Sequence, residues 1–317
     1  MESTETPAPR IALRGVRKDF GQVTAIADLS LSVVDGEVFV LLGQSGCGKS
    51  TVLQLVNRML DPDGGQILVG GVDVASMDPV VLRRTIGYVI QQIGLFPHRT
   101  VAANVGTVCA LSGWDRRATR ARVSEMLELV GLPPAEFASR YPHQLSGGQQ
   151  QRVGVARALA ASPPLLLMDE PFGALDPQIR RGLQAEFRTW VRELGTTVMF
   201  VTHDVDEATM LADRIAVLGP QGRLDQVGSP AEVLGRPATA EVAEFLGADR
   251  ILRRLSVVPV RAAVEPTSAP SGSSHVDADA TAYDALLALI ESPTGVVAVS
   301  AGGSIAWPAL AALARNP

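Results

Sequence analysis

The residues most clearly able to do chemistry form a glycine-rich loop at positions 43–50 that ends in Lys49 and Ser50. In a G-x-x-x-x-G-K-S pattern, backbone N–H groups turn inward and cradle the phosphates of a nucleotide. Lys49 would add a positive charge for the β- and γ-phosphates, and the Ser50 hydroxyl is a ligand for Mg²⁺. The loop residues predicted to bind the phosphates are Gly43, Ser45, Gly46, Cys47, Gly48, Lys49, Ser50 and Thr51.

The flanking sequence places this loop between a strand and a helix. Residues 38–42 are a continuous apolar run that is typical of a buried strand, and residues 50–59 carry apolar side chains at helical spacing. The N-terminus of that helix would face the bound anion. A chance glycine turn is the alternative, and both flanking elements argue against it.

A second candidate site is the pair Asp169 and Glu170, which follows the apolar run 165–168. Sites in parallel sheets lie beyond the carboxyl ends of the strands, so we expect both carboxylates near the phosphate loop. Asp169 would hold Mg²⁺ directly or through water, and Glu170 would act as general base on the attacking water. The alternative is that the pair only caps a helix at the strand end.

A third candidate is the string Leu-Ser-Gly-Gly-Gln at positions 145–149. Ser146 can cap the following helix, and the two glycines leave its backbone N–H groups accessible to an anion. One ATP cannot occupy both glycine loops of one chain. We therefore expect a head-to-tail homodimer with ATP at the interface, between Lys49 of one chain and Ser146 of the other. A plain helix cap before a glycine turn is the alternative.

Composition limits the class of protein. The 317 residues are 46% hydrophobic, enough for one large domain and a smaller one. A net charge of −5 argues against a nucleic-acid partner. Cys47 and Cys109 are expected to be free thiols in a reducing compartment. The sequence has no apolar run long enough for a membrane span, and residues 1–9, predicted to be disordered, do not form a secretory signal. We expect a cytoplasmic protein.

The order of the predicted elements favours an α/β fold with a parallel sheet. Residues 11–34 alternate like strands, whereas residues 93–160 lack a strand signal and are predicted to form a helical subdomain with one helical run from 100 to 130. The stretch 266–275, rich in Pro and Ser, is linker-like. The predicted organisation is a domain at 10–247, a linker at 248–281 and a small α/β tail at 282–317.

In combination and order, these motifs resemble the ATP-binding-cassette (ABC) ATPases over about residues 10–247. The matching positions are the Walker A loop at 43–50, Gln91 of the Q-loop, the signature at 145–149, Asp169 and Glu170 of Walker B, the D-loop at 173–176, the switch residue His203, and Phe20 as the aromatic that stacks on adenine. The D-loop has Gly173 where the family often has Ser.

The resemblance implies a P-loop NTPase fold in which a parallel-sheet core carries an antiparallel β subdomain and a helical subdomain. It implies an enzyme that hydrolyses ATP with Mg²⁺. The catalytic residues would be Glu170, His203 and Gln91, and the metal ligands Ser50, Gln91 and Asp169. Besides the loop, the nucleotide-binding set would comprise Phe20, Ser146, Gly147, Gly148, Gln149 and Asp176.

Two strings resemble the ATPases of quaternary-amine importers, which take up glycine betaine, choline or proline. They are residues 86–98, which contain Gln-Gln-Ile-Gly at 91–94, and residues 249–256. The resemblance implies import of an osmoprotectant through separate permease subunits, with a substrate-binding protein as an indirect partner and the chain at the cytoplasmic face of the membrane. Residues 91–110 are expected to receive the coupling helix of the permease. Packing in the core is the alternative role of Ile93, Leu95 and Phe96, and both roles can hold.

Other functions are compatible with part of this pattern. ATPases of polyamine, iron and sugar importers share neighbouring residues. A soluble ABC protein of DNA repair or translation is disfavoured, because the sequence has neither a long coiled-coil insertion nor a second cassette. The tail resembles a single CBS unit, a module that relatives often carry in pairs, and is expected to regulate the protein or assist its dimerisation.

Overall fold

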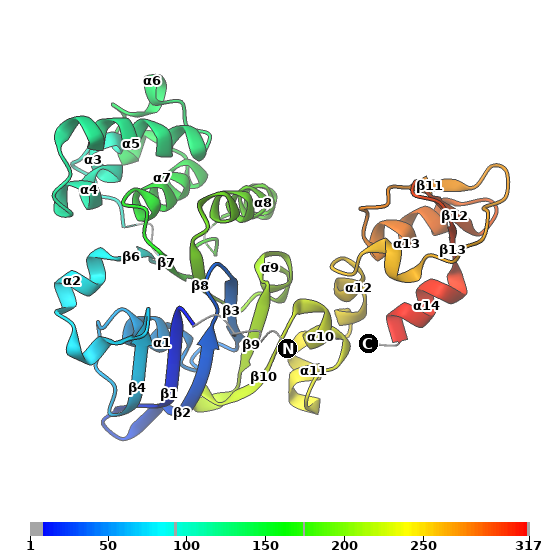
Figure 1. The fold of residues 1–317 in the computed structure, drawn as a ribbon, viewed down its shortest axis with the longest axis horizontal. Helices are drawn as coiled ribbons and strands as arrows, with labels where there is room; N and C mark the ends of the chain where they lie inside the picture. Colours follow the sequence, from blue (N-terminus) through cyan, green and yellow to red (C-terminus); the bar gives the residue numbers. More distant parts are fainter. Residues whose placement is uncertain (1–8, 92–93, 174, 316–317) are drawn as a thin grey trace, which may run out of the picture. The chain divides into compact units, whose positions relative to one another are not determined.

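The structure, a computed structural model, describes residues 9–91, 94–173 and 175–315 and divides into two compact units. Unit 1 comprises residues up to 207 together with 211–224, and unit 2 comprises 208–210 together with residues from 225 onward. Figure 1 shows the elements of both units. Across the described ranges, no helix combines the length and apolar character needed to cross a bilayer.

A parallel sheet forms the centre of unit 1. Its strands in this unit have the order β9-β3-β8-β7-β6, and every neighbouring pair is parallel. They are β3 (Val38–Gly43), β6 (Ile86–Val89), β7 (Leu165–Asp169), β8 (Thr197–Thr202) and β9 (Arg214–Leu218). Because β3 and β8 are buried at every residue, they consist of apolar runs rather than alternating patterns.

A second, antiparallel sheet in unit 1 has the order β2-β1-β4-β5. Its strands are β1 (Ile11–Phe20), β2 (Val23–Val33), β4 (Gly64–Val69) and β5 (Val72–Asp73). One face alternates into the core, which is the pattern expected of a sheet with one solvated side. The predicted parallel core and antiparallel β subdomain are both present.

The helices of unit 1 include a separate cluster that Figure 1 shows beyond β6 and β7. This cluster is α3 (Val101–Val105), α4 (Thr107–Leu111), α5 (Arg116–Leu129), α6 (Pro134–Phe137) and α7 (Gly147–Leu159). The other helices are α1 (Lys49–Val56), α2 (Pro79–Arg84), α8 (Pro177–Leu194) and α9 (Val205–Leu211), with short 3₁₀ turns at Val74–Ser76, Pro142–Gln144 and Pro220–Gly222. The predicted helical subdomain is confirmed.

The prediction of a single helical run from 100 to 130 was wrong, because three helices occupy it. Gly113 adopts a left-handed backbone (φ +79°) after α4. Asp115 then starts α5, since its Oδ1 accepts hydrogen bonds from the N–H groups of Arg117 and Ala118. The helix predicted at 50–59 also ends early, at Val56, and Arg58 has a φ of +49°.

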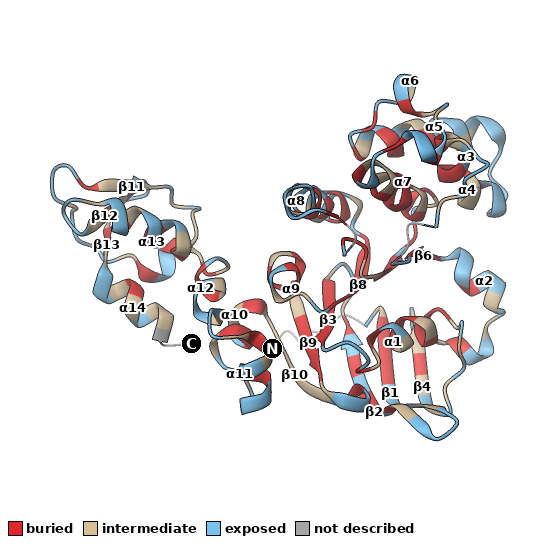
Figure 2. Ribbon diagram, turned by 180° about the vertical axis from the view of Figure 1, so that it is seen from behind, coloured by how far each residue is buried: buried red, intermediate tan, exposed pale blue. Residues whose placement is uncertain are grey.

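Buried residues of unit 1 concentrate on the sheet and the inner helix faces (Figure 2), and three aromatic rings pack together among mainly aliphatic side chains. Phe172 lies between Phe187 of α8 and Phe200 of β8, with both ring-centroid distances at 5.9 Å. All three side chains are fully buried. Such contacts fix the strand ends that carry the polar residues discussed below.

Unit 2 has its own core and a small sheet with the order β11-β12-β13. Its elements are β10 (Leu224–Gly228), α10 (Pro230–Gly235), α11 (Ala240–Leu246), α12 (Arg250–Leu255), a 3₁₀ turn at Val260–Ala263, β11 (Ser274–Val276), α13 (Ala282–Glu291), β12 (Val296–Val299), β13 (Ser304–Ala306) and α14 (Trp307–Arg315). The predicted division at 247 and linker at 248–281 do not coincide with this unit, because Leu255 and Val260 are buried in the same core as Ala285 and Ile305.

Candidate nucleotide-binding site

The phosphate loop joins the end of β3 to the start of α1. Gly48 takes the position before the helix with φ +104°, and a Cβ there would lie 2.8 Å from the carbonyl O of Ala25. Only glycine fits this close approach without strain. The backbone N–H groups of the first turn of α1 are thereby left facing the loop, where an anion is stabilised.

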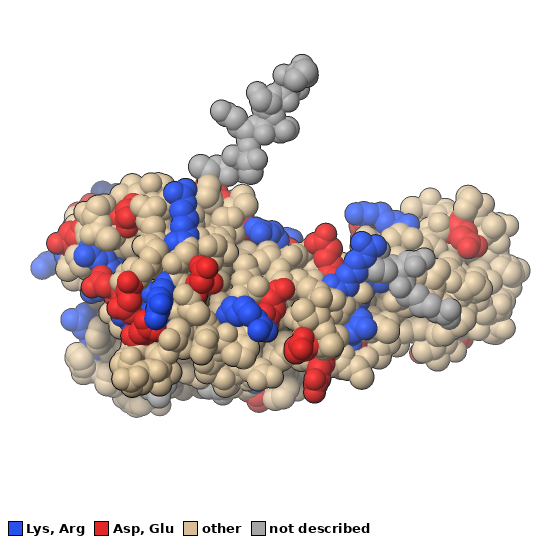
Figure 3. Space-filling view, turned by 90° about the horizontal axis from the view of Figure 1, so that it is seen from below, with Lys and Arg blue, Asp and Glu red and all other residues tan. Residues whose placement is uncertain are grey.

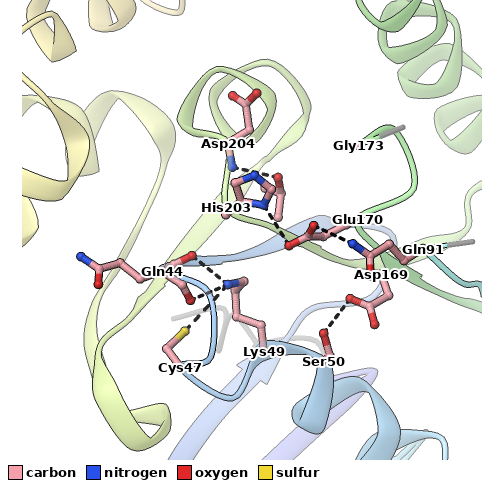
Figure 4. A network of polar contacts seen from close by, with 12 residues as sticks. Gln44, Cys47, Lys49, Ser50, Gln91, Asp169, Glu170, Gly173, His203 and Asp204 are labelled. Atoms are coloured by element: carbon pink, nitrogen blue, oxygen red, sulfur yellow. Dashed lines mark hydrogen bonds and ion pairs between the residues drawn. The ribbon is translucent and has the colours of Figure 1, made fainter. Parts of the chain in front are cut away.

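Lys49 occupies the centre of the loop and is only 5% exposed. Its Nζ donates hydrogen bonds to the carbonyl oxygens of Gly43 (2.7 Å) and Gln44 (2.8 Å) and lies 3.9 Å from the Sγ of Cys47 (Figure 4). Neutral carbonyls hold the ammonium in place without cancelling its charge, so that charge is available to a phosphate. Cys47 and Cys109 are both buried and neither forms a disulfide, as predicted.

Two oxygen ligands suited to Mg²⁺ meet beside the loop. The Ser50 Oγ donates a hydrogen bond of 2.9 Å to Oδ1 of Asp169, which comes from the end of β7. Burial raises the pKa of the Asp169 carboxyl above its ordinary value, and the Ser50 hydrogen bond works against this shift. Mg²⁺ is usually held by one or two carboxylates together with substrate phosphates and water, so this sparse pair fits it.

Glu170 lies between two side chains that the sequence singled out. Its Oε1 is 2.9 Å from Nδ1 of His203, which follows β8, and its Oε2 accepts a hydrogen bond of 3.3 Å from the Nε2 of Gln91, which follows β6. Figure 4 shows the three side chains converging above the loop. The carboxyl ends of three parallel strands therefore assemble one site, as the predicted sheet requires.

The backbone of Glu170 adopts a left-handed conformation with φ +42°, a feature the sequence analysis missed. Its N–H is nevertheless paired, since it donates to the carbonyl of Val201 at 3.0 Å. A non-glycine residue at positive φ costs roughly 1–3 kcal/mol, and such strain concentrates at functional sites. No pattern in the sequence marks this conformation.

The signature residues form a separate helix start at α7, where Ser146 and Gly147 are exposed while Leu145 and Gly148 are buried. Ser146 Oγ accepts from the N–H of Gln149 (3.3 Å), and Gln149 Oε1 accepts from the N–H of Ser146 (3.0 Å). The predicted N-cap at Ser146 is confirmed, and the reciprocal cap by Gln149 is an addition. A Cβ on Gly148 would meet Ile179 of α8 at 3.0 Å, so α7 packs closely there.

The remaining predicted site residues lie on the margins of the site. Phe20 ends β1 with its ring 47% exposed and the ammonium of Lys18 lying 5.6 Å from the ring centroid. An exposed ring is available for stacking. Asp176 caps α8, since its Oδ1 accepts from the N–H of Ile179 at 3.1 Å. Ala174 in the D-loop, and Gln92 and Ile93 in the importer-like string, lie outside the described residues.

Comparison with known proteins places this site in a family. The sequence pattern described as "ABC transporter" matches residues 26–173. The glycine betaine uptake system ATP-binding protein YehX of Escherichia coli is 50% identical over 240 residues, and the match covers 76% of this chain and 77% of that protein. This chain belongs to the ABC transporter family.

Two other relatives are also named as ATP-binding proteins of import or transport systems. The osmoprotectant import ATP-binding protein OsmV of Salmonella typhimurium is 50% identical, with 78% of this chain and 66% of that protein covered. The glycine betaine/carnitine/choline transport ATP-binding protein OpuCA of Bacillus subtilis is 51% identical, with 74% and 61% covered. The chain thus spans slightly less than two thirds of the length of these two relatives.

Solved ABC structures share the fold. A dimeric post-hydrolysis state of the ATP-binding cassette MJ0796, bound to ADP and Pi, superimposes with a TM-score of 0.62 at 33% identity. The alignment covers 69% of this chain and 98% of that one. The predicted ABC cassette fold is confirmed by this match, whereas the likeness of the tail to a CBS unit stays a prediction.

Proposed function

We propose that this chain is the ATP-hydrolysing subunit of an importer for osmoprotectants of the quaternary-amine type, acting through separate permease subunits. The observation that carries the ATPase part is the position of the Glu170 carboxylate. It sits between Gln91 and His203, next to the loop that holds Lys49. The relatives named for glycine betaine, choline and carnitine transport support the substrate class.

The site residues divide the work of phosphoryl transfer, which depends mainly on positioning and on charge stabilisation. Lys49 and the first turn of α1 would bind the β- and γ-phosphates. Glu170 would accept a proton from the attacking water, and His203 would orient the base and contact the γ-phosphate. Ser50, Asp169 and Gln91 would hold Mg²⁺, which supplies charge neutralisation when bound.

The decisive experiment for hydrolysis compares two glutamine variants of the full-length protein. Glu170→Gln should lower ATP turnover about 10²- to 10⁴-fold, the usual contribution of a general base. Glu128→Gln, at an exposed position of α5, is the matched control and should leave turnover unchanged. Wild-type turnover in the Glu170→Gln protein would overturn the base assignment.

We also propose that ATP holds two chains head to tail, with the exposed α7 start of each facing the phosphates bound by the other. The solved relative described as dimeric supports this arrangement. The ATP-loaded Glu170→Gln protein should show the mass of a dimer by light scattering and return to a monomer without ATP. A strictly monomeric protein in both conditions would refute the proposal.

A groove of about 320 Å³ in unit 1 is the proposed docking site for the permease. It contains Phe96, Thr107 and Val108 from the segment expected to receive the coupling helix. Arg83, Arg84 and Arg157 also line the groove, and none of its described lining residues is acidic. The other lining residues are Asn57, Met59, Ile86, Gly87, Tyr88, Ile90, Phe96, Thr107, Val108, Ala158, Ala161 and Pro163. The partner segment should therefore be an apolar helix that carries a carboxylate.

Loss of the exposed Phe96 ring should weaken recovery of the permease with the ATPase. Phe96→Ala is compared with Val81→Ala, which truncates an exposed apolar residue of α2 that does not line the groove. Equal recovery of the permease with both variants would exclude the groove as the docking site.

The transported solute is tested by uptake. Cells that lack their own systems and express this chain with its permease should accumulate labelled glycine betaine or choline. Accumulation of spermidine instead would favour the polyamine alternative, which relatives such as the spermidine/putrescine import ATP-binding protein of Nitrosomonas europaea represent at 46% identity.

For unit 2 we propose a regulatory role resembling that of a single CBS unit. Its strand–helix–strand–strand–helix order from β11 to α14 supports this assignment. Leu287 and Ile290 on α13 are exposed apolar side chains that do not belong to its core. Replacing both with Ser should alter dimer formation or the salt dependence of uptake, and no change in either would contradict a regulatory role.

A further inference from the structure

Arg180 lies one turn into α8, and its guanidinium contacts two segments next to the proposed catalytic residues. Its Nη2 donates to the carbonyl oxygens of Leu175 (3.0 Å) and, more weakly, Gly173 (3.5 Å), both in the D-loop. Its Nη1 donates to Oδ2 of Asp204 at 3.4 Å. A planar guanidinium can bind a carboxylate and carbonyls together, which a single ammonium cannot do as well.

These contacts complete a closed ring around the general base. The carbonyl of Glu170 accepts a hydrogen bond from the N–H of Gly173 at 3.2 Å. The carbonyl of Gly173 in turn accepts from the guanidinium of Arg180, which also pairs with the carboxylate of Asp204. Asp204 directly follows His203, whose imidazole returns to the Glu170 carboxylate. Figure 4 shows Asp204 next to His203, and Gly173 on the nearby loop beyond Glu170. A ring of this kind restricts every member more than separate contacts would.

The Asp204 carboxylate is held by backbone hydrogen bonds, so a contact with Asp204 also restrains the neighbouring residue, His203. Its Oδ1 accepts from the N–H groups of Asp206 (2.9 Å) and Glu207 (3.1 Å), which leaves Oδ2 for Arg180. One turn further along α8, Gln184 donates to Oε1 of Glu207 at 2.8 Å. One face of α8 thus contacts the start of α9 at two points, Asp204 and Glu207.

Packing alone does not account for an arginine at position 180. Within the described residues its Nε is buried and has no hydrogen-bond acceptor. Leaving a buried donor unpaired is unfavourable, so an apolar side chain would serve packing better. The two terminal nitrogens, by contrast, donate to the D-loop and to Asp204.

We propose that Arg180 is a positioning residue for ATP hydrolysis. It fixes the D-loop backbone relative to the His203–Asp204 turn and so preserves the geometry between His203 and Glu170 during turnover. This inference rests on the proposed ATPase function. The hydrogen bonds of Arg180 go to Gly173, Leu175 and Asp204, none of which belongs to the predicted nucleotide-binding set, so its loss should lower kcat and leave the KM for ATP nearly unchanged.

The test uses steady-state ATP hydrolysis by the full-length protein and three single variants. Arg180→Gln should lower kcat about 10- to 100-fold, the range expected when a reacting group is displaced by about 1 Å, with KM within about twofold. Asp204→Asn should behave alike, because asparagine keeps the cap on α9 through its one oxygen but replaces the Oδ2 acceptor of Arg180 with an NH2 donor. Arg181→Gln, at the exposed neighbouring position, is the control and should keep wild-type kinetics.

The double variant Arg180→Gln, Asp204→Asn decides whether the two residues act together. If they form one unit, it should be no slower than the slower single variant. Arg180→Lys should recover part of kcat. Losses that multiply, a raised KM with normal kcat, or wild-type kinetics in both single variants would overturn the inference.

Protein stability and the proposed function are separated in the same experiment. Melting temperatures identify a variant that folds poorly. If Arg180→Gln folds poorly, Asp204→Asn alone tests the inference, because asparagine retains the cap on α9. If the wild-type protein hydrolyses no ATP even with its permease, the proposed function and this inference both fail. Normal wild-type turnover together with unaffected Arg180→Gln and Asp204→Asn turnover removes only the role of Arg180.

Discussion

Replacing Glu207 with glutamine should change how folding stability depends on pH. Glu207 is 5% exposed and accepts a hydrogen bond from Gln184, while the Thr202 side chain provides another. Burial is the main cause that raises the pKa of Glu207 from 4.5 to about 7, and the nearby charge of Asp204 adds to it. The folded protein therefore binds this proton more tightly than the unfolded chain.

The sign of the effect follows from proton binding. As the pH rises from about 4.5, the unfolded chain releases the proton first, so it binds fewer protons than the folded state and stability falls. The stabilising effect of the bound proton is fully present below pH 4.5 and is lost once the pH passes about 7. Each pKa unit is worth about 1.4 kcal/mol, so the rise from 4.5 to about 7 sets an upper limit of roughly 3–4 kcal/mol for the loss.

Glutamine keeps an acceptor oxygen for Gln184 and cannot ionise. We therefore expect Glu207→Gln to be about 1–3 kcal/mol more stable than wild type at pH 8, and this difference to disappear near pH 4.5. Urea unfolding at pH 4.5, 6, 7 and 8 measures it, with Glu128→Gln as an exposed control that stays within about 0.5 kcal/mol of wild type. A Glu207→Gln difference that is constant with pH would refute the reasoning.

Three further substitutions test particular features of the structure. Gly48→Ala should weaken ATP binding about tenfold or more in a nucleotide titration, because its Cβ would lie 2.8 Å from the carbonyl of Ala25 at a φ of +104°; unchanged affinity would contradict the loop geometry. Phe200→Ala should cost about 3–5 kcal/mol in urea unfolding, since its fully buried ring stacks on that of Phe172; a cost below about 1 kcal/mol would argue against this core. Gly303→Ala should lower the melting temperature, because its Cβ would lie 2.5 Å from Val264 at a φ of +92°; an unshifted melting curve would show that the turn is placed wrongly.

The parts of the site that follow from local sequence pattern were predictable. Apolar runs marked β3, β7 and β8, and in a parallel sheet the residues after such runs must share one edge. This rule by itself predicts that Lys49, Asp169 and His203 lie close together. The cap at Ser146 was also predictable, because capping depends on a few adjacent residues.

Features that depend on distant partners could not be predicted. The φ of +42° at Glu170 is imposed by its surroundings in the folded chain, and its residue type gives no sign of it. The contacts of Arg180 depend on how α8 packs against the turn after β8. Likewise, a stretch rich in Pro and Ser resembled a linker, although the residues around it share one core with α13.

The left-handed backbone at Glu170 has a consequence for protein engineering. A selection for heat resistance alone, with no requirement for turnover, should favour glycine at this position, since glycine adopts the conformation without steric penalty. Such a variant would be more stable and would bind ATP, but it would lack the general base proposed for ATP hydrolysis. Variant libraries designed to raise the thermal stability of this protein should therefore keep Glu170 unchanged.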